Sequence, residues 1–332
     1  MKKKRFASLL LLAPLALLAA CNSTPKLALE ANWFSNTSTK IIPDDFEETL
    51  EYAVSFEKSA AALNGRFSVD YPNGGTYTVK FTSGSTADGK KTYIYTTEEK
   101  MDVRYTLDGK STELMTDVVT TRVEFLDVSN DLKPLTSWRE VHATVPLRNP
   151  TAPAATLDAC YAKVDYKNVF TYDHEKSKAT FVQTNLALED KENNQTTTVI
   201  GIGGKGIFFD NEQLIPLLRA ADLSSSMTIR TIDTQTSSKC AMTIKSGPSS
   251  VTVTQKVKLK SDEEAVERNF NANEISLAYK KQNSGPSQKF TIAQRGSRDS
   301  NTFRNVCLKF EQPIIYSQGT LIYRLVSANF YN

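Results

Sequence analysis

Residues 76–97 have the sequence TYTVKFTSGSTADGKKTYIYTT. Apolar or aromatic residues alternate with polar ones from 77 to 81, Tyr93 and Tyr95 repeat the spacing of two, and the dipeptide Asp88-Gly89 lies between the two runs. A period of two places one face of a strand in the core and the other in water. Asp-Gly between such runs is a strong signal for a hairpin turn. This stretch therefore predicts two antiparallel strands.

The same pattern extends over most of the chain after Arg66. Asn73-Gly74 and Asp108-Gly109 are further turn signals. Other alternating runs lie at 103–107, 119–125, 164–171, 179–188, 196–202, 227–232, 241–244, 251–259, 275–279, 290–293, 306–310 and 321–326. Short turns between successive strands favour a long antiparallel meander. We expect a mainly β (α+β) fold in which the meander forms a strongly curved sheet or half-barrel, while a closed barrel and a sandwich also satisfy the pattern.

Two helices interrupt the predicted meander. The first would begin near Pro43, where Asp44 and Glu47 have capping-box spacing, and end at Asn64-Gly65. Its apolar stripe would contain Phe46, Leu50, Ala53, Val54 and Ala61. The second is a short apolar helix near 212–221, capped by Asp210 or Asn211.

Prolines mark a further break in the pattern. The stretch 145–156 contains Pro146, Pro150 and Pro153, and proline removes a donor from a sheet ladder. We therefore expect a long connection or a seam here, within a single β-rich domain that spans 43–332.

The beginning of the sequence predicts export. Residues 2–5 carry four positive charges, and an apolar run from 6 to 20 follows them, which is typical of a secretory signal peptide over residues 1–20. The run ends at Leu18-Ala19-Ala20-Cys21, which resembles the lipobox of bacterial lipoproteins. The resemblance implies that Cys21 is acylated and becomes the first residue after cleavage. Residues 21–42 are rich in polar residues and predict a flexible tether.

Charge and composition limit the partners. Removing the four basic residues of the signal peptide leaves 36 basic against 37 acidic residues. A nearly neutral chain without a basic stripe is not typical of a nucleic-acid-binding protein. The alternating Lys256, Lys258 and Lys260 predict one solvated strand face. The three remaining cysteines are Cys160, Cys240 and Cys307; three buried thiols are the favoured interpretation, and a Cys240–Cys307 disulfide is the alternative.

No catalytic, cofactor or metal site is predicted. The run Gly201–Gly206 matches a dinucleotide fingerprint in letters only, because no helix is expected to begin in it. His142 and His174 lack the partners of a zinc or triad motif, and His174 is expected in a polar turn. The chain is therefore interpreted as non-enzymatic.

The whole arrangement resembles the incomplete-barrel lipoproteins of bacterial envelopes, among them the LolA/LolB carriers and the mycobacterial lipid-binding lipoproteins. That resemblance rests on the lipobox, the tether, the N-terminal helix, the meander and the short apolar helix. It implies that the concave face of the sheet binds a lipid or another acylated molecule. In this hypothesis the ligand pocket is lined or gated by Phe208, Phe209, Leu214, Leu217 and Leu218.

A second hypothesis has a filled core and no small-molecule ligand. The chain would then be a structural or protein-binding surface lipoprotein with an envelope protein as its partner. Both hypotheses place the protein outside the cytoplasm, anchored to the outer face of the cell membrane, or in the periplasm or outer membrane of a host with two membranes.

Overall fold

The computed structural model of the chain describes residues 47–128, 131–147, 154–188, 194–203, 208–221, 223, 225–233, 238–247, 250–279, 287–294 and 305–330. The predicted signal peptide, Cys21 and the tether lie outside these residues. The described part of the chain contains no helix that is long and apolar enough to cross a membrane.

Strands dominate the described residues. They are β1 (Glu47–Lys58), β2 (Phe67–Asp70), β3 (Gly75–Ser85), β4 (Lys91–Leu107), β5 (Lys110–Ser111), β6 (Met115–Val128), β7 (Asp131–Pro146), β8 (Tyr161–Asp173), β9 (Lys178–Asn185), β10 (Gln195–Gly201), β11 (Met227–Asp233), β12 (Ser238–Ser246), β13 (Val251–Leu259), β14 (Val266–Tyr279), β15 (Lys289–Ala293), β16 (Cys307–Ile314) and β17 (Gly319–Asn329). The helices are α1 (Ala60–Asn64) and α2 (Leu214–Ala220), with short 3-10 turns η3 (Leu157–Ala159), η4 (Asn211–Gln213) and η5 (Ile315–Ser317).

All of these strands belong to one sheet, which curls on itself. Neighbouring strands follow the order β10-β9-β8-β7-β6-β4-β3-β1-β17-β16-β15-β14-β12-β11, with β2 and β5 beside β4 and with β13 beside β14. The two ends approach each other, because Phe208 forms a parallel bridge to Arg230 of β11. The guanidinium of Arg230 also donates to the carbonyl oxygens of Ile202 and Gly203. The predicted mainly β fold with a strongly curved sheet is confirmed.

The predicted helix at the start of the domain is wrong, because residues 47–58 form strand β1. Its burial has the period of a strand: Leu50, Tyr52 and Val54 are buried, whereas Ala53 is exposed. Strand β1 pairs with β3 on one side and with β17 on the other, so it is a central strand. The helix α1 begins only at Ala60, where the Ser59 hydroxyl caps the Ala62 N–H at 3.1 Å.

Strand β7 is not among the strands predicted from the sequence, and it contains Pro134. The proline sits at an irregularity of the β6–β7 register, where it lies opposite Phe125 and a bulge absorbs the lost donor. Strands β7 and β8 then pair from Thr136 to Pro146, so the sheet is continuous at the expected seam. Residues 148–153 of that connection lie outside the described residues.

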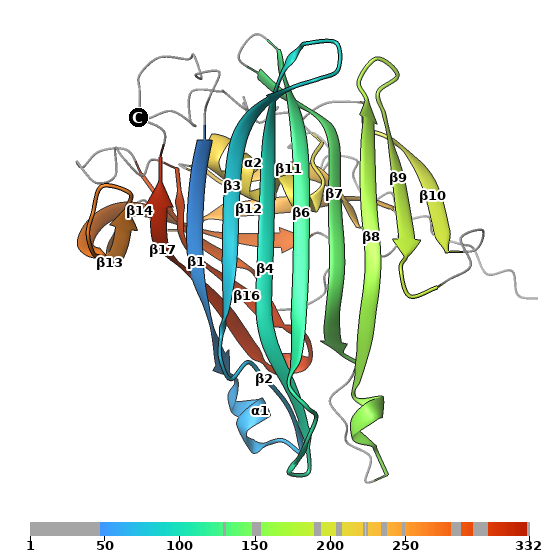
Figure 1. Cartoon of the computed structure of the whole chain (residues 1–332), viewed down its shortest axis with the longest axis vertical. Helices are drawn as coiled ribbons and strands as arrows, with labels where there is room; N and C mark the ends of the chain where they lie inside the picture. The colour runs from blue at the N-terminus through green and yellow to red at the C-terminus, as the bar shows by residue number, and fades with distance from the viewer. Residues whose placement is uncertain are drawn as a thin grey trace, which may run out of the picture.

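The short apolar helix is present as η4 followed by α2, close to the predicted range 212–221. Figure 1 shows α2 behind β3, β4 and β6, inside the curve of the sheet. Leu217 and Leu218 pack into a core cluster that also contains inward-facing residues of β1, β3, β4, β12, β14 and β17. The helix therefore fills much of the concave side of the sheet.

Candidate functional site

The turn before α2 is fixed to the barrel wall by a buried carboxylate. Asp210 caps η4, since its side chain accepts from the Glu212 N–H at 2.9 Å. It also accepts from the Ser137 hydroxyl of β7, from the Tyr172 hydroxyl of β8 and from the Gln213 amide. Burial raises the pKa of Asp210, and these hydrogen bonds oppose the rise.

A second polar contact holds the end of α2 against β1. Arg219 donates from Nη1 and Nη2 to the two carboxylate oxygens of Glu48, and the Nη2–Oε2 distance is 3.1 Å. Both side chains are almost completely buried. The helix is therefore attached at both ends by charged groups, and its position relative to the wall is fixed.

A cavity of about 110 Å³ remains between α2 and the inner faces of β3, β4, β6, β7 and β15–β17. Its apolar and aromatic lining consists of Tyr77, Tyr95, Val119, Leu214, Ile215, Phe290, Phe310 and Tyr323. Its polar lining consists of Thr97, Glu99, Thr121, Arg139, Asn211, Glu212, Gln288 and Gln312. Three ionisable groups thus share one small interior space with aromatic rings.

Arg139 has one long ion pair in this cavity. Its Nη1 lies 3.9 Å from Glu212 Oε1, which is an ion pair but too long for a hydrogen bond. Its Nε is buried without a hydrogen-bond partner. The side chain is 35 % exposed, because it lines the cavity on a side that is open to solvent. Its guanidinium donors are therefore available to whatever occupies that space.

The two carboxyl groups of the cavity resist ionisation. Burial raises the pKa of Glu212 to about 7, although the charge of Arg139 opposes this rise. Burial also raises the pKa of Glu99, which accepts a hydrogen bond from the Tyr323 hydroxyl. Near neutral pH the cavity is consequently less negative than two glutamates beside one arginine would suggest.

The five residues predicted to line a pocket are distributed differently. Leu214 lines the cavity. Phe209, Leu217 and Leu218 are at most 2 % exposed and pack in the main core. Phe208 belongs to a smaller cluster with residues of β8, β9, β10 and β11. The structure therefore brings one of the five to the cavity and uses the other four in packing.

Arg139, Glu99 and Glu212 were not predicted from the sequence as site residues. A signal was present in two of them, because Glu99 is in phase with the inward-facing Tyr93 and Tyr95 of β4 and Arg139 is in phase with the buried Val141 of β7. A charged residue at an inward position of an alternating strand must be paired or must face a cavity. Glu212, in a 3-10 turn, carries no such periodic signal.

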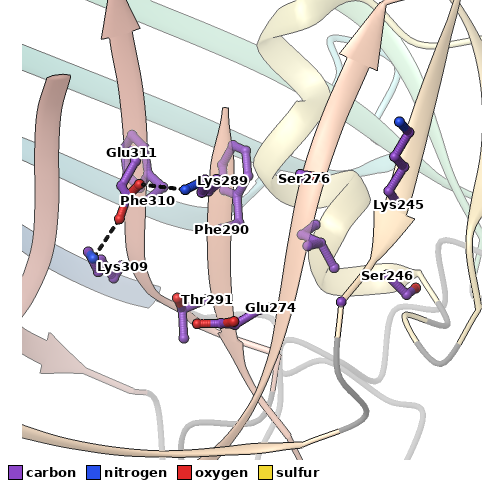
Figure 2. Close-up of a pocket in the computed structure, with 12 residues that line it drawn as sticks. Lys245, Ser246, Glu274, Ser276, Lys289, Phe290, Thr291, Lys309, Phe310 and Glu311 are labelled. Atoms are coloured by element: carbon purple, nitrogen blue, oxygen red, sulfur yellow. Dashed lines mark hydrogen bonds and ion pairs between the residues drawn. The ribbon is translucent and has the colours of Figure 1, made fainter. Parts of the chain in front are cut away.

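A second hollow, of about 300 Å³, lies on strands β12, β14, β15 and β16. Figure 2 shows its charged side chains, with Lys289 and Lys309 joined by dashed lines to Glu311. Lys309 Nζ is 2.6 Å and Lys289 Nζ is 3.8 Å from the carboxylate of Glu311. These ion pairs are partly exposed and already compensated, so they indicate a solvated surface more than a binding site.

Other candidate chemistry is weaker. His142 is exposed on β7 between Glu140 and Asp165, and His174 lies in the turn after β8, as predicted. Among the described residues no group of three histidine, cysteine or acidic side chains is placed to bind a metal ion. Cys160, Cys240 and Cys307 form no disulfide, and Cys160 and Cys307 are buried.

Comparison with known proteins yields a structural likeness. No protein-family model and no curated protein matches this chain. The fold is similar to a solved one. That structure is a beta-barrel-like protein of domain of unknown function DUF1849 from Brucella abortus. The two share 12% sequence identity with a TM-score of 0.46, over 88% of this chain and 100% of the other.

Proposed function

We propose that this chain is an exported lipoprotein, anchored through Cys21, whose curved sheet binds an apolar or acylated molecule without catalysing a reaction. The observation that carries the proposal is the cavity beside α2, in which Leu214, Phe290 and Phe310 form an apolar wall inside the barrel. Ligand pockets combine an apolar and aromatic wall with polar groups that orient the ligand, and this cavity contains both, although half of its lining residues are polar.

The size of the cavity limits the ligand. About 110 Å³ corresponds to roughly four water molecules, whereas drug-sized ligands occupy about 300 Å³ or more. The cavity therefore accommodates a short acyl group or one end of a longer molecule. The rest of a longer molecule would leave through the open side of the cavity.

Mass spectrometry of the mature protein extracted from membranes tests the anchor and the ligand separately. Under denaturing conditions we expect a covalent lipid mass that the Cys21→Ser variant lacks. Under native conditions we expect an additional noncovalent mass, which Leu214→Glu reduces. Leu63→Glu is the matched control, because Leu63 is exposed on α1. Equal native and denatured masses for the unmodified protein would overturn ligand binding while leaving the anchor intact.

A second function is favoured by the packing of α2. Leu217 and Leu218 are at most 1 % exposed, so the helix acts as part of a filled core. A filled barrel is a suitable scaffold for a structural or protein-binding lipoprotein. Native and denatured masses that agree would support this alternative, and the next experiment would then be chemical crosslinking of the anchored protein in its own membrane.

A further inference from the structure

We propose that the cavity beside α2 is an oxyanion site, in which the guanidinium of Arg139 receives the carboxylate or phosphate group of the ligand. This inference rests on the proposed function and specifies the chemistry of its ligand. The oxyanion site would bind the polar end of the ligand, whereas the apolar wall would contact its acyl part.

The geometry of Arg139 supports this assignment. Arginine presents five donors in a planar fork that matches the two oxygens of a carboxylate or phosphate. Glu212 Oε1 lies 3.9 Å from Arg139 Nη1 and does not engage the fork with a hydrogen bond. By contrast, the other arginine beside α2, Arg219, donates from both Nη atoms to the two oxygens of Glu48. The Nη atoms of Arg219 are thus engaged within the protein, whereas Arg139, whose side chain is 35 % exposed, lines the cavity.

The rest of the cavity suits an oxyanion with a short apolar body. The amide side chains of Asn211, Gln288 and Gln312 border the same space and offer N–H donors. The apolar body would contact Leu214 and Phe310. The volume of about 110 Å³ suits a short apolar body, and a longer chain would extend through the open side of the cavity.

The charges around the site predict a pH dependence. Glu212 faces Arg139 of β7 and Asp210 at the start of its own turn, while Glu99 of β4 faces Arg139 and Tyr323 of β17. A bound anion would favour the protonated forms of both glutamates, since like charges in a small space repel. Binding should therefore take up protons, and affinity should fall as pH rises through about 7, the pKa of Glu212.

Isothermal titration calorimetry of the mature protein with hexanoate, hexyl phosphate and hexan-1-ol tests the proposal. We expect at least one of the two anions to bind at least tenfold more tightly than the alcohol at pH 6, and more tightly at pH 6 than at pH 8. The preferred anion identifies a carboxylate or a phosphate as the natural group.

Two variants test the residues. Arg139→Lys keeps the charge but loses the fork, and we expect at least a tenfold loss of anion affinity with little change for hexan-1-ol. Glu212→Gln removes the competing carboxyl group, so anion binding should tighten and lose most of its pH dependence. Arg122→Gln on β6 is the control, because Arg122 pairs with Glu124 and does not line the cavity.

The outcomes separate the two proposals. Equal binding of the alcohol and the anions would overturn the oxyanion site and leave apolar ligand binding intact. Binding of none of the three probes, with a noncovalent mass still present in native mass spectrometry, would also overturn the oxyanion site alone. Absence of both signals would overturn both proposals.

Discussion

Arg219 on α2 and Glu48 on β1 are 171 residues apart in sequence, and they form an ion pair with both side chains almost completely buried. Strand β1 is a central strand of the sheet, and α2 lies on its concave side. The pair therefore fixes the helix to the middle of the barrel wall. The contribution of this pair to stability can be compared with that of a second arginine–glutamate pair that is partly exposed.

Removing one partner of this pair should be costly. We expect Arg219→Met to lower the free energy of unfolding by about 3–5 kcal/mol, because the Glu48 carboxylate would remain buried without its counter-charge. Combining it with Glu48→Leu should restore much of that loss. The control is Arg122→Met in the partly exposed pair with Glu124, where less than about 1 kcal/mol is expected. Urea unfolding measures all three variants against the unmodified protein; equal losses at the two arginines would contradict the prediction.

The Glu212 carboxyl group should make the protein less stable as pH rises. Its pKa in the folded protein is about 7, against 4.5 for an ordinary glutamate, so the folded state binds more protons between these values. Stability from this group is complete below pH 4.5 and is lost as pH rises through 7, by about 3 kcal/mol in total. Asp117, with a pKa of about 6, adds to the same trend.

Urea unfolding from pH 4.5 to 8.5 checks the sign and the residue. The unmodified protein should lose stability relative to Glu212→Gln across this range, since glutamine does not ionise. Parallel pH profiles for the two proteins would show that Glu212 titrates normally.

Two turn glycines with the same backbone handedness should differ in their tolerance of alanine. Gly74 and Gly89 have φ values of +63° and +80°. A Cβ on Gly74 would lie 2.4 Å from the carbonyl oxygen of Val54, whereas a Cβ on Gly89 meets no atom within 4 Å. We expect Gly89→Ala to cost about 1 kcal/mol from the left-handed conformation alone, and Gly74→Ala to cost at least about 2 kcal/mol. Chemical denaturation distinguishes them, and similar losses would refute the steric argument.

The three cysteines of the barrel should react with thiol reagents at different rates. Cys240 is half-buried, whereas Cys160 and Cys307 are buried and burial raises the pKa of Cys307 to about 12. We expect Cys240 to be modified first in the native protein and all three thiols to react after denaturation without a reductant. Recovery of a single thiol under those conditions would indicate a disulfide.

The sequence predicted where the strands lie better than it predicted which strands pair with each other. Alternation and turn dipeptides such as Asp88-Gly89 identify most strands, because both depend on residues that are close in sequence. Residues 47–58 were mistaken for a helix, since Leu50, Ala53 and Val54 also match a helical stripe. What decides this segment is pairing with β3 and β17, and β17 ends at Asn329. Such remote pairing overrides local preference.

The site was less predictable than the fold for the same reason. Leu214 was identified from its helix, but the charged groups that face it come from β4 and β7 and meet only when the sheet curls. Arg139 and Glu99 each show an inward position on their own strand. Nothing in the sequence indicates that the two strands place them in one cavity.

The position of β1 has a consequence for how the chain is made. Thr49 of β1 pairs with Asn329 of β17, so the first described strand completes its hydrogen bonds only with nearly the last residues of the sequence. A chain that lacks β17 leaves the second edge of β1 uncovered. An uncovered strand edge can pair with other chains, so such a product is expected to aggregate.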